Sequence, residues 1–187
     1  NKTPGRVRGT PHSAQLLHLD LNALRQPNLT DNAPLLSTSG DNLANAFATL
    51  SRKERGELAG QFAALVPTFA DVDVRPLDPG RQHLLFQDRW APNALYTANE
   101  VSDGTILVLA YLVMQFQRTQ PDLILVEEPE RGLHPYLLGS LVSFLRKMSR
   151  GETGRRAVQI VLATHSADLL DHLEPGEVRF LTRDVQE

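Results

Sequence analysis

The sequence has 187 residues and a net charge of -3, and 41% of its residues are hydrophobic while 22% are charged, as in ordinary globular proteins. It contains no cysteine, which excludes disulfides and thiolate metal sites and makes a cytoplasmic location the expectation. Acidic and basic residues are interspersed, without the basic stripe typical of duplex-binding domains, so DNA contact is left undecided. No apolar run approaches the ~20 residues of a membrane-spanning helix.

Residues 1–92 are predicted to form a lead-in, a helical insertion and a β-hairpin. The sequence opens at Asn1 without an initiator methionine or a signal-peptide core, so we expect a fragment or a trimmed product. The second helix of the insertion begins at the capping box of Ser51 and Glu54 and ends before Pro67. The expected segments are a loose lead-in over 1–15, a strand within 16–24, a loop over 26–40, helices over 41–50 and 51–66, and hairpin strands over 70–76 and 82–88.

Residues 93–187 are predicted to form an α/β unit. Residues 123–126 and 157–163 are largely apolar, which is typical of strands buried on both faces of a parallel sheet. Helices alternate with these strands, so right-handed crossovers favour a mostly parallel sheet with helices on both faces. The expected segments are a helix from Ser102 to about Thr119, a strand over 123–126, a helix from Pro135 to about Met148, a strand over 157–163, a short helix over 166–172 and a last strand over 178–181.

Two adjacent acids, Glu127 and Glu128, follow the first apolar strand. They lie at its carboxyl end, where ligands bind in open α/β sheets. Adjacent acids there are typical of P-loop ATPases, in which the first holds Mg²⁺ and the next polarises the attacking water. The register gives Glu127 the magnesium role and Glu128 the catalytic role, whereas Asp122 lies at the other end of the strand. On these residues alone, an exposed turn after a strand fits equally well.

Three further segments have weaker signals. His165 ends the second apolar strand, where a neutral imidazole can donate to a γ-phosphate, although a lone strand-end histidine is more often structural. Ser102 precedes a helix whose first N–H groups form an anion site, although an ordinary helix cap explains this residue better. Residues 130–135 predict only a turn when they are taken in isolation.

In chain order the four motifs are Ser-Asp-Gly-Thr at 102–105, the apolar strand with Glu-Glu-Pro-Glu at 123–130, Gly-Leu-His-Pro at 132–135 and Thr-His-Ser at 164–166. In this order they resemble the motifs of ABC-type ATPases of the SMC/RecF-like superfamily. They are most similar to bacterial ATPases that are grouped with AAA domains and related to the overcoming-lysogenization-defect (OLD) ATPases. The resemblance covers roughly residues 16–182, and Gly40 to Ala44 is similar to a stretch that precedes the helical insertion of these proteins. It matches the signature motif to Ser102, Asp103, Gly104 and Thr105, the Walker B acids to Glu127 and Glu128, the D-loop to residues 130–135, and the switch histidine to His165.

The resemblance implies a P-loop NTPase-like α/β fold, ATP and Mg²⁺ as cofactors, and two copies arranged head to tail around two ATP molecules. It implies that Glu127 holds Mg²⁺, although the family usually has aspartate there, that Glu128 activates water, and that His165 contacts the γ-phosphate. ATP would close the dimer and hydrolysis would reopen it, in DNA repair, chromosome maintenance or anti-phage defence. The nucleotide-binding residues implied are Ser102, Asp103, Gly104 and Thr105 of the signature motif, with Glu130 and His134 of the D-loop.

The Walker A loop, Gly-x-x-x-x-Gly-Lys-[Ser/Thr], is missing, because the sequence contains no Gly-Lys pair. We therefore expect the C-terminal half of an ABC-type ATPase that is inactive alone and completed by a Walker A segment, removed or on a partner chain. Two alternatives stay open. One is a non-enzymatic half-ATPase module that only associates with a partner. The other is a metal-dependent nuclease, which needs an acid-rich domain after the ATPase. A nuclease or effector is also a possible partner of the ATPase.

Overall fold

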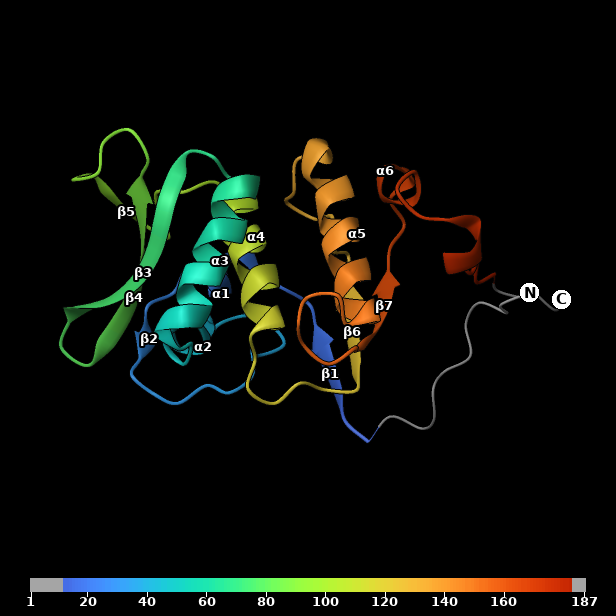
Figure 1. Ribbon diagram of the computed structural model, residues 1–187, viewed down its shortest axis with the longest axis horizontal. Coiled ribbons are helices and arrows are strands. Elements are labelled where there is room, and N and C mark those ends of the chain that lie inside the picture. Colours follow the sequence, from blue (N-terminus) through green and yellow to red (C-terminus); the bar gives the residue numbers. More distant parts are fainter. Residues whose placement is uncertain (1–11, 183–187) are drawn as a thin grey trace, which may run out of the picture.

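The computed structural model describes residues 12–182, which fold around two β-sheets with helices between and beside them (Figure 1). Most of the predicted lead-in over residues 1–15 lies outside the described residues. Buried side chains of both sheets and of the helices α1 to α5 form one hydrophobic core, which extends along the chain from Leu17 to Val158. A second, smaller cluster consists of Leu138, Val142 and Leu169. Within residues 12–182, no helix combines the length and the apolar character needed to cross a bilayer.

The first sheet is parallel. It contains β1 (Ala14–Leu17), β6 (Leu123–Glu127) and β7 (Gln159–Ala163) in the order β1-β6-β7. Helix α5 (Pro135–Arg150) connects β6 to β7, and α6 (Ala167–Leu170) follows β7. The mixed α/β fold with a parallel sheet and flanking helices is therefore confirmed. Since β1 comes from the first 92 residues, this sheet joins segments from both sides of the boundary predicted there.

The second sheet is antiparallel and includes the predicted hairpin of β3 (Phe69–Asp78) and β4 (Arg81–Asp88). The hairpin turns at Gly80, whose φ of 72° suits a residue without a side chain. The short strands β2 (Asn28–Leu29) and β5 (Leu95–Thr97) both pair with β4, near its start and its end respectively. This sheet lies at the opposite side of the molecule from the parallel sheet (Figure 1).

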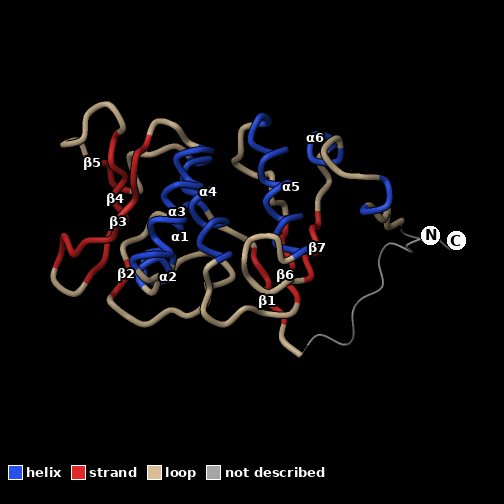
Figure 2. The backbone as a smooth tube through the Cα atoms, in the orientation of Figure 1, coloured by secondary structure: helices blue, strands red, loops and turns tan. Residues whose placement is uncertain are grey.

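Helix α4 (Asp103–Gln115) lies in the middle of the molecule, between the two sheets (Figure 2). Every residue from Thr105 to Gln115 is buried, as expected of a helix that is apolar on all sides. The other helices that pack against it are α1 (Leu21–Leu24), α2 (Leu43–Ala48) and α3 (Arg52–Leu65).

Two predicted boundaries are wrong for identifiable reasons. The helix expected to reach Thr119 ends at Gln115, because the chain turns so that the buried Gln117 can exchange two side-chain hydrogen bonds with Gln15, of 2.9 and 3.0 Å. The strand expected within residues 16–24 covers only residues 14–17. Asp20 ends it, because its carboxylate accepts the Ala23 N–H and thereby caps α1.

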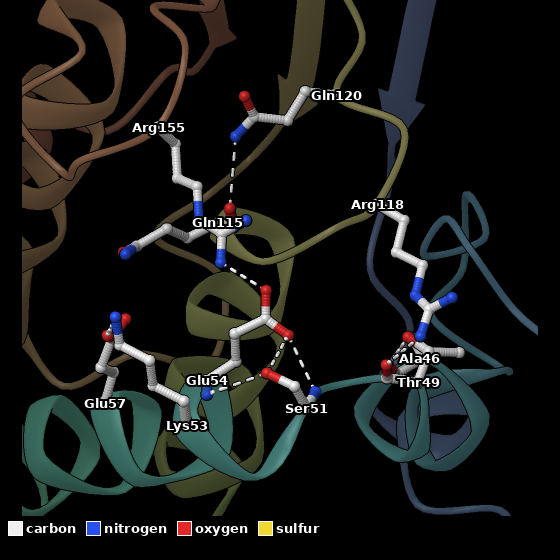
Figure 3. Close-up of polar contacts among 10 residues, drawn as sticks. All are labelled: Ala46, Thr49, Ser51, Lys53, Glu54, Glu57, Gln115, Arg118, Gln120 and Arg155. Carbon is white, nitrogen blue, oxygen red and sulfur yellow. Dashed lines mark hydrogen bonds and ion pairs between the residues drawn. The ribbon is translucent and has the colours of Figure 1, made fainter.

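The predicted capping box of α3 is present and is part of a longer polar chain (Figure 3). The carboxylate of Glu54 accepts the N–H and the hydroxyl of Ser51, both at 2.8 Å, and Arg155 donates to it at 2.5 Å. Burial raises the pKa of Glu54, but the hydrogen bonds from Arg155 and Ser51 outweigh it and lower this pKa to about 2. Arg155 belongs to the loop between α5 and β7, so this contact ties the helical insertion to the parallel-sheet half.

The parallel sheet is covered on one face only among residues 12–182, which corrects the expectation that its strands are buried on both faces. Ile124 and Val126 are buried in the core with α4 and α5. On the other face, register aligns Leu16, Leu125 and Val161 in one row across the three strands. Leu16 is 42% exposed and Val161 44% exposed, because no described helix packs there. This open face of Leu16, Leu125 and Val161 is an apolar surface without a cover.

The last predicted strand, over residues 178–181, is also absent. These residues follow a 3-10 turn (Pro175–Glu177) and pair with no strand of the described chain. Phe180 is 82% exposed and Leu181 97% exposed. A strand forms only where a neighbour accepts and donates its backbone hydrogen bonds, so the apolar pattern alone does not produce one here.

Candidate functional site

The carboxyl ends of β1, β6 and β7 share one edge of the parallel sheet, and polar residues follow each strand at this edge. His18 follows β1, Glu127 ends β6 and Glu128 follows it, and His165 lies two residues after β7. Parallel pairing of β6 with β7 is what the sequence predicted, because only this pairing brings the two strand-end motifs together. The site is an edge assembled from residues more than a hundred positions apart in the chain.

Glu128 and His165 are in direct contact. The distance from Nδ1 of His165 to Oε1 of Glu128 is 3.2 Å, and the side chains are 82% and 36% exposed, respectively. The backbone N–H of Glu128 donates to the carbonyl of Ala163 at 2.8 Å, which extends the β6–β7 pairing by one residue. A base and a hydrogen-bond donor, both open to solvent, therefore face the same small volume.

Glu128 has a strained backbone. Its φ is 44°, and within residues 12–182 it is the only residue other than glycine with a positive φ. The left-handed conformation costs a residue with a side chain roughly 1–2 kcal/mol. Such strain gathers at functional sites, where the surrounding structure holds a side chain in a required direction.

His18 is a residue of the site that sequence reasoning missed. Its Nδ1 lies 2.7 Å from Oε2 of Glu127, and both side chains are about half exposed. Its only signal in the sequence is a histidine directly after the first apolar strand. Within the described chain, no group of three or more His, Asp or Glu side chains has the geometry of a metal site. One half-exposed carboxylate nevertheless fits Mg²⁺, which keeps several waters and takes phosphate oxygens.

Glu130 connects the segment after β6 to the segment after β7. Oε1 of Glu130 accepts a hydrogen bond from the Thr164 hydroxyl at 2.7 Å, and that hydroxyl accepts one from the N–H of Ser166 at 2.9 Å. These bonds fix the residues on both sides of His165. Its other oxygen is buried and has no hydrogen-bond partner in residues 12–182. Burial, with a smaller effect of the Glu130 charge, raises the pKa of Tyr111, whose hydroxyl donates to the Pro129 carbonyl at 3.2 Å. The structure therefore turns Glu130 toward the protein interior.

The signature residues form the start of α4. Ser102 is the N-cap, and its hydroxyl accepts the N–H of Thr105 at 3.3 Å and contacts the Thr105 hydroxyl at 2.8 Å. Ser102 and Asp103 are exposed, while Thr105 is buried. A side chain at Gly104 would lie 3.8 Å from the carbonyl oxygen of Gly132, so the start of α4 packs against the segment that follows the two acids.

His134 lies at the start of α5, where it accepts the Tyr136 N–H at 3.4 Å as an N-cap. Its exposed ring lies 4.8 Å from the ring of Tyr136, between centroids. Gly132, two residues earlier, has a φ of 84° and lies so close to Leu107 that a side chain would come within 3.0 Å of it. The tight turn thus needs glycine at this position.

A cavity of about 310 Å³ lies apart from this edge, since none of its lining residues belongs to the ends of β1, β6 and β7. Its lining includes Arg25, His83 and Thr97.

A family model described as "AAA domain, putative AbiEii toxin, Type IV TA system" matches residues 20–171. No curated protein sequence gives a match.

Among solved structures, an SMC head bound to the C-winged helix domain of ScpA is 13% identical with a TM-score of 0.57, over 86% of this chain and 49% of that chain. A Pyrococcus furiosus SMC head domain with an extended coiled coil, bound to the C-terminal domain of ScpA, is 16% identical with a TM-score of 0.44, over 64% and 29% of the two chains. A structure from work on ATP-driven dimerization and DNA stimulated activation of SMC ATPases is 13% identical with a TM-score of 0.48, over 71% and 76%. The first of these likenesses shows the SMC-head fold, and this chain spans about half of that structure.

Proposed function

We propose that this chain carries the hydrolytic half of an ATP-driven dimerising switch. The premise is that it belongs to the AAA-domain family of AbiEii-like ATPases, within the SMC/RecF-like superfamily of ABC-type ATPases. Family and fold make it an ATPase module. The observation that carries the finer proposal is the contact of Glu128 with His165 at the shared edge of β6 and β7, with Glu128 in a strained backbone conformation.

The residues at the edge divide the chemistry. Bound Mg²⁺ would supply positive charge to the phosphate oxygens, and Glu127 would hold it. Glu128 orients the attacking water and accepts its proton, while His165 donates a hydrogen bond to the γ-phosphate. His18 fixes the direction of the Glu127 carboxylate through their 2.7 Å contact.

The exposed start of α4 serves the γ-phosphate that is bound by the opposite copy. Ser102 caps the N–H of Thr105, and the N–H groups of Asp103 and Gly104 lie at the helix start, where the helix dipole favours an anion. His134 presents an exposed ring in the segment that follows the two acids, where it contacts the nucleotide across the dimer. Glu130, which is turned inward, supports that segment rather than the nucleotide directly.

A Walker A segment completes the site, either upstream in the same protein or on a partner chain. The sequence has no Gly-Lys pair, so its own residues do not supply the phosphate loop. The edge of β7 opposite β6 pairs with no strand of residues 12–182, and the open face of Leu16, Leu125 and Val161 has no cover. A Walker A unit is a strand, a loop and a helix, so its strand fits this edge and its helix fits this face.

The test uses the complete ATPase, meaning this chain together with the segment that carries its Gly-Lys-Ser/Thr loop. Glu128→Gln keeps the shape of the side chain and removes the base. We expect ATP binding to persist, hydrolysis to fall by about 10²–10⁴-fold, and dimers to accumulate in ATP. Glu152→Gln, at an exposed position in the loop before β7, is the matched control. An ATP-independent monomer population in the Glu128→Gln protein contradicts the dimer switch, and unchanged hydrolysis contradicts the role of Glu128.

The absence of a Gly-Lys pair supports one other candidate, a non-enzymatic module that only associates with its partner. The same experiment separates the two, because such a module assembles but shows no hydrolysis that depends on Glu128. We propose that the switch acts in DNA repair, chromosome maintenance or anti-phage defence. A nuclease or effector partner would bind differently to its ATP-bound dimer and to its open form.

A further inference from the structure

Arg25 is a partly buried cation held against the start of α4. It lies at the end of α1, and its side chain is only 14% exposed. One guanidinium nitrogen donates to the carbonyl oxygens of Ala98 and Val101, the latter at 2.9 Å. The other donates to the carboxylate of Asp103 at 2.7 Å. One side chain thus fixes both the loop that enters α4 and the first residue of the helix.

Asp103 is an electrostatic problem for an anion site. Its carboxylate lies in the first turn of α4, next to the N–H groups at the helix start that would receive a phosphate. A carboxylate there favours the helix in the absence of ligand, but its charge repels a bound phosphate. The Arg25 guanidinium, at 2.7 Å, offsets part of this charge; salt screens the pair only partly, because the Arg25 side chain is 14% exposed although Asp103 is 55% exposed.

We propose that Arg25 is a positioning and charge-compensating residue, which makes the start of α4 receptive to the γ-phosphate of the opposite copy. This inference rests on the proposed dimer switch. In this role Arg25 acts through the start of α4, since three of its five N–H donors are used by two carbonyls and a carboxylate of that segment. Its loss therefore acts on dimer formation and leaves ATP binding within each copy unchanged.

The experiment measures ATP-dependent dimer affinity in the complete Glu128→Gln protein, in which hydrolysis does not interfere. We expect Arg25→Gln to weaken the dimer at least tenfold, while the affinity of each copy for ATP changes less than twofold. Arg52→Gln, at an exposed position of α3, removes an equal charge elsewhere and is the matched control. Asp103→Asn added to Arg25→Gln should restore most of the loss, because the uncompensated carboxylate is gone.

This rescue separates charge compensation from simple support of the fold. The inference is overturned if the double variant does not regain dimer affinity. It is also overturned if Asp103→Asn alone loses as much dimer affinity as Arg25→Gln does. If Arg25→Gln alone does not fold, as measured by circular dichroism, the Arg25→Gln/Asp103→Asn protein decides: dimer affinity near that of the parent supports the inference, and a tenfold loss overturns it. If the Glu128→Gln parent itself does not dimerise in ATP, the proposed function fails and takes this role of Arg25 with it. If the parent dimerises and Arg25→Gln matches it, only the role of Arg25 fails.

Discussion

The strained backbone of Glu128 makes a prediction that needs only this chain. Replacing Glu128 with Gly or with Ala removes the same carboxylate and the same contact with His165, so the two variants differ in backbone preference alone. At a φ of 44°, alanine bears the left-handed cost of roughly 1–2 kcal/mol, whereas glycine does not. Glycine loses about 0.5–1 kcal/mol more conformational entropy on folding. We therefore expect Glu128→Gly to be more stable than Glu128→Ala by about 0.5–1 kcal/mol.

Glu127 supplies a matched control with the opposite sign. It is the last residue of β6 and has no positive φ, so Glu127→Gly should be less stable than Glu127→Ala by about 0.5–1 kcal/mol. Urea unfolding of the four variants gives the free energies, and thermal unfolding should show shifts of about 2–4 °C per kcal/mol. If alanine is as stable as glycine at position 128, the backbone strain is absent and the argument that function maintains it fails.

Three other predictions use simple assays. The isolated chain should hydrolyse ATP no faster than background in the presence of Mg²⁺, and turnover that disappears in Glu128→Gln would reveal an unrecognised phosphate loop. Glu54→Gln should lower the free energy of unfolding at pH 7 by about 1–3 kcal/mol, because the Glu54 pKa falls from 4.5 to about 2 on folding. The difference between the two proteins should be complete above pH 4.5 and should shrink as the pH decreases toward 2. Urea unfolding at each pH measures it. Val161→Glu should change the stability of the isolated chain by less than about 0.5 kcal/mol but should block copurification with the Walker A segment. Leu77→Glu, at an exposed position in the other sheet, is the control and should still copurify. Copurification of both variants contradicts docking on the open face.

Local signals in the sequence predicted the elements that depend on local chemistry. The Ser51 and Glu54 capping box, the hairpin that turns at Gly80, and the N-cap of α4 at Ser102 are all present. Each consists of a hydrogen bond or a backbone conformation that a few consecutive residues determine. The strand ends at Glu128 and His165 were predicted to meet for a different reason, since parallel strands of one sheet must end at the same edge.

Features that depend on distant residues could not be predicted. The end of α4 is determined by the pairing of Gln117 with Gln15, about a hundred residues away. His18 and Arg25 are single residues without a spacing pattern, and their roles follow from the sites that the fold brings to them. The expected strand over residues 178–181 failed because its pattern describes a strand that has a neighbour, and no neighbour is present among residues 12–182.

The same reasoning connects the incomplete sheet to the incomplete site. If the Walker A strand pairs with β7 in parallel, its carboxyl end lies beside Thr164 and His165, and the phosphate loop that follows it faces Glu128. A right-handed turn then brings the following helix back over one face of the sheet, and the open face of Leu16, Leu125 and Val161 is the one available. Burial of this apolar face would therefore stabilise the chain in the same step that places the phosphates against the catalytic residues. Association, folding stability and ATPase activity should consequently rise together, and a segment that binds without stabilising the chain is not the missing half.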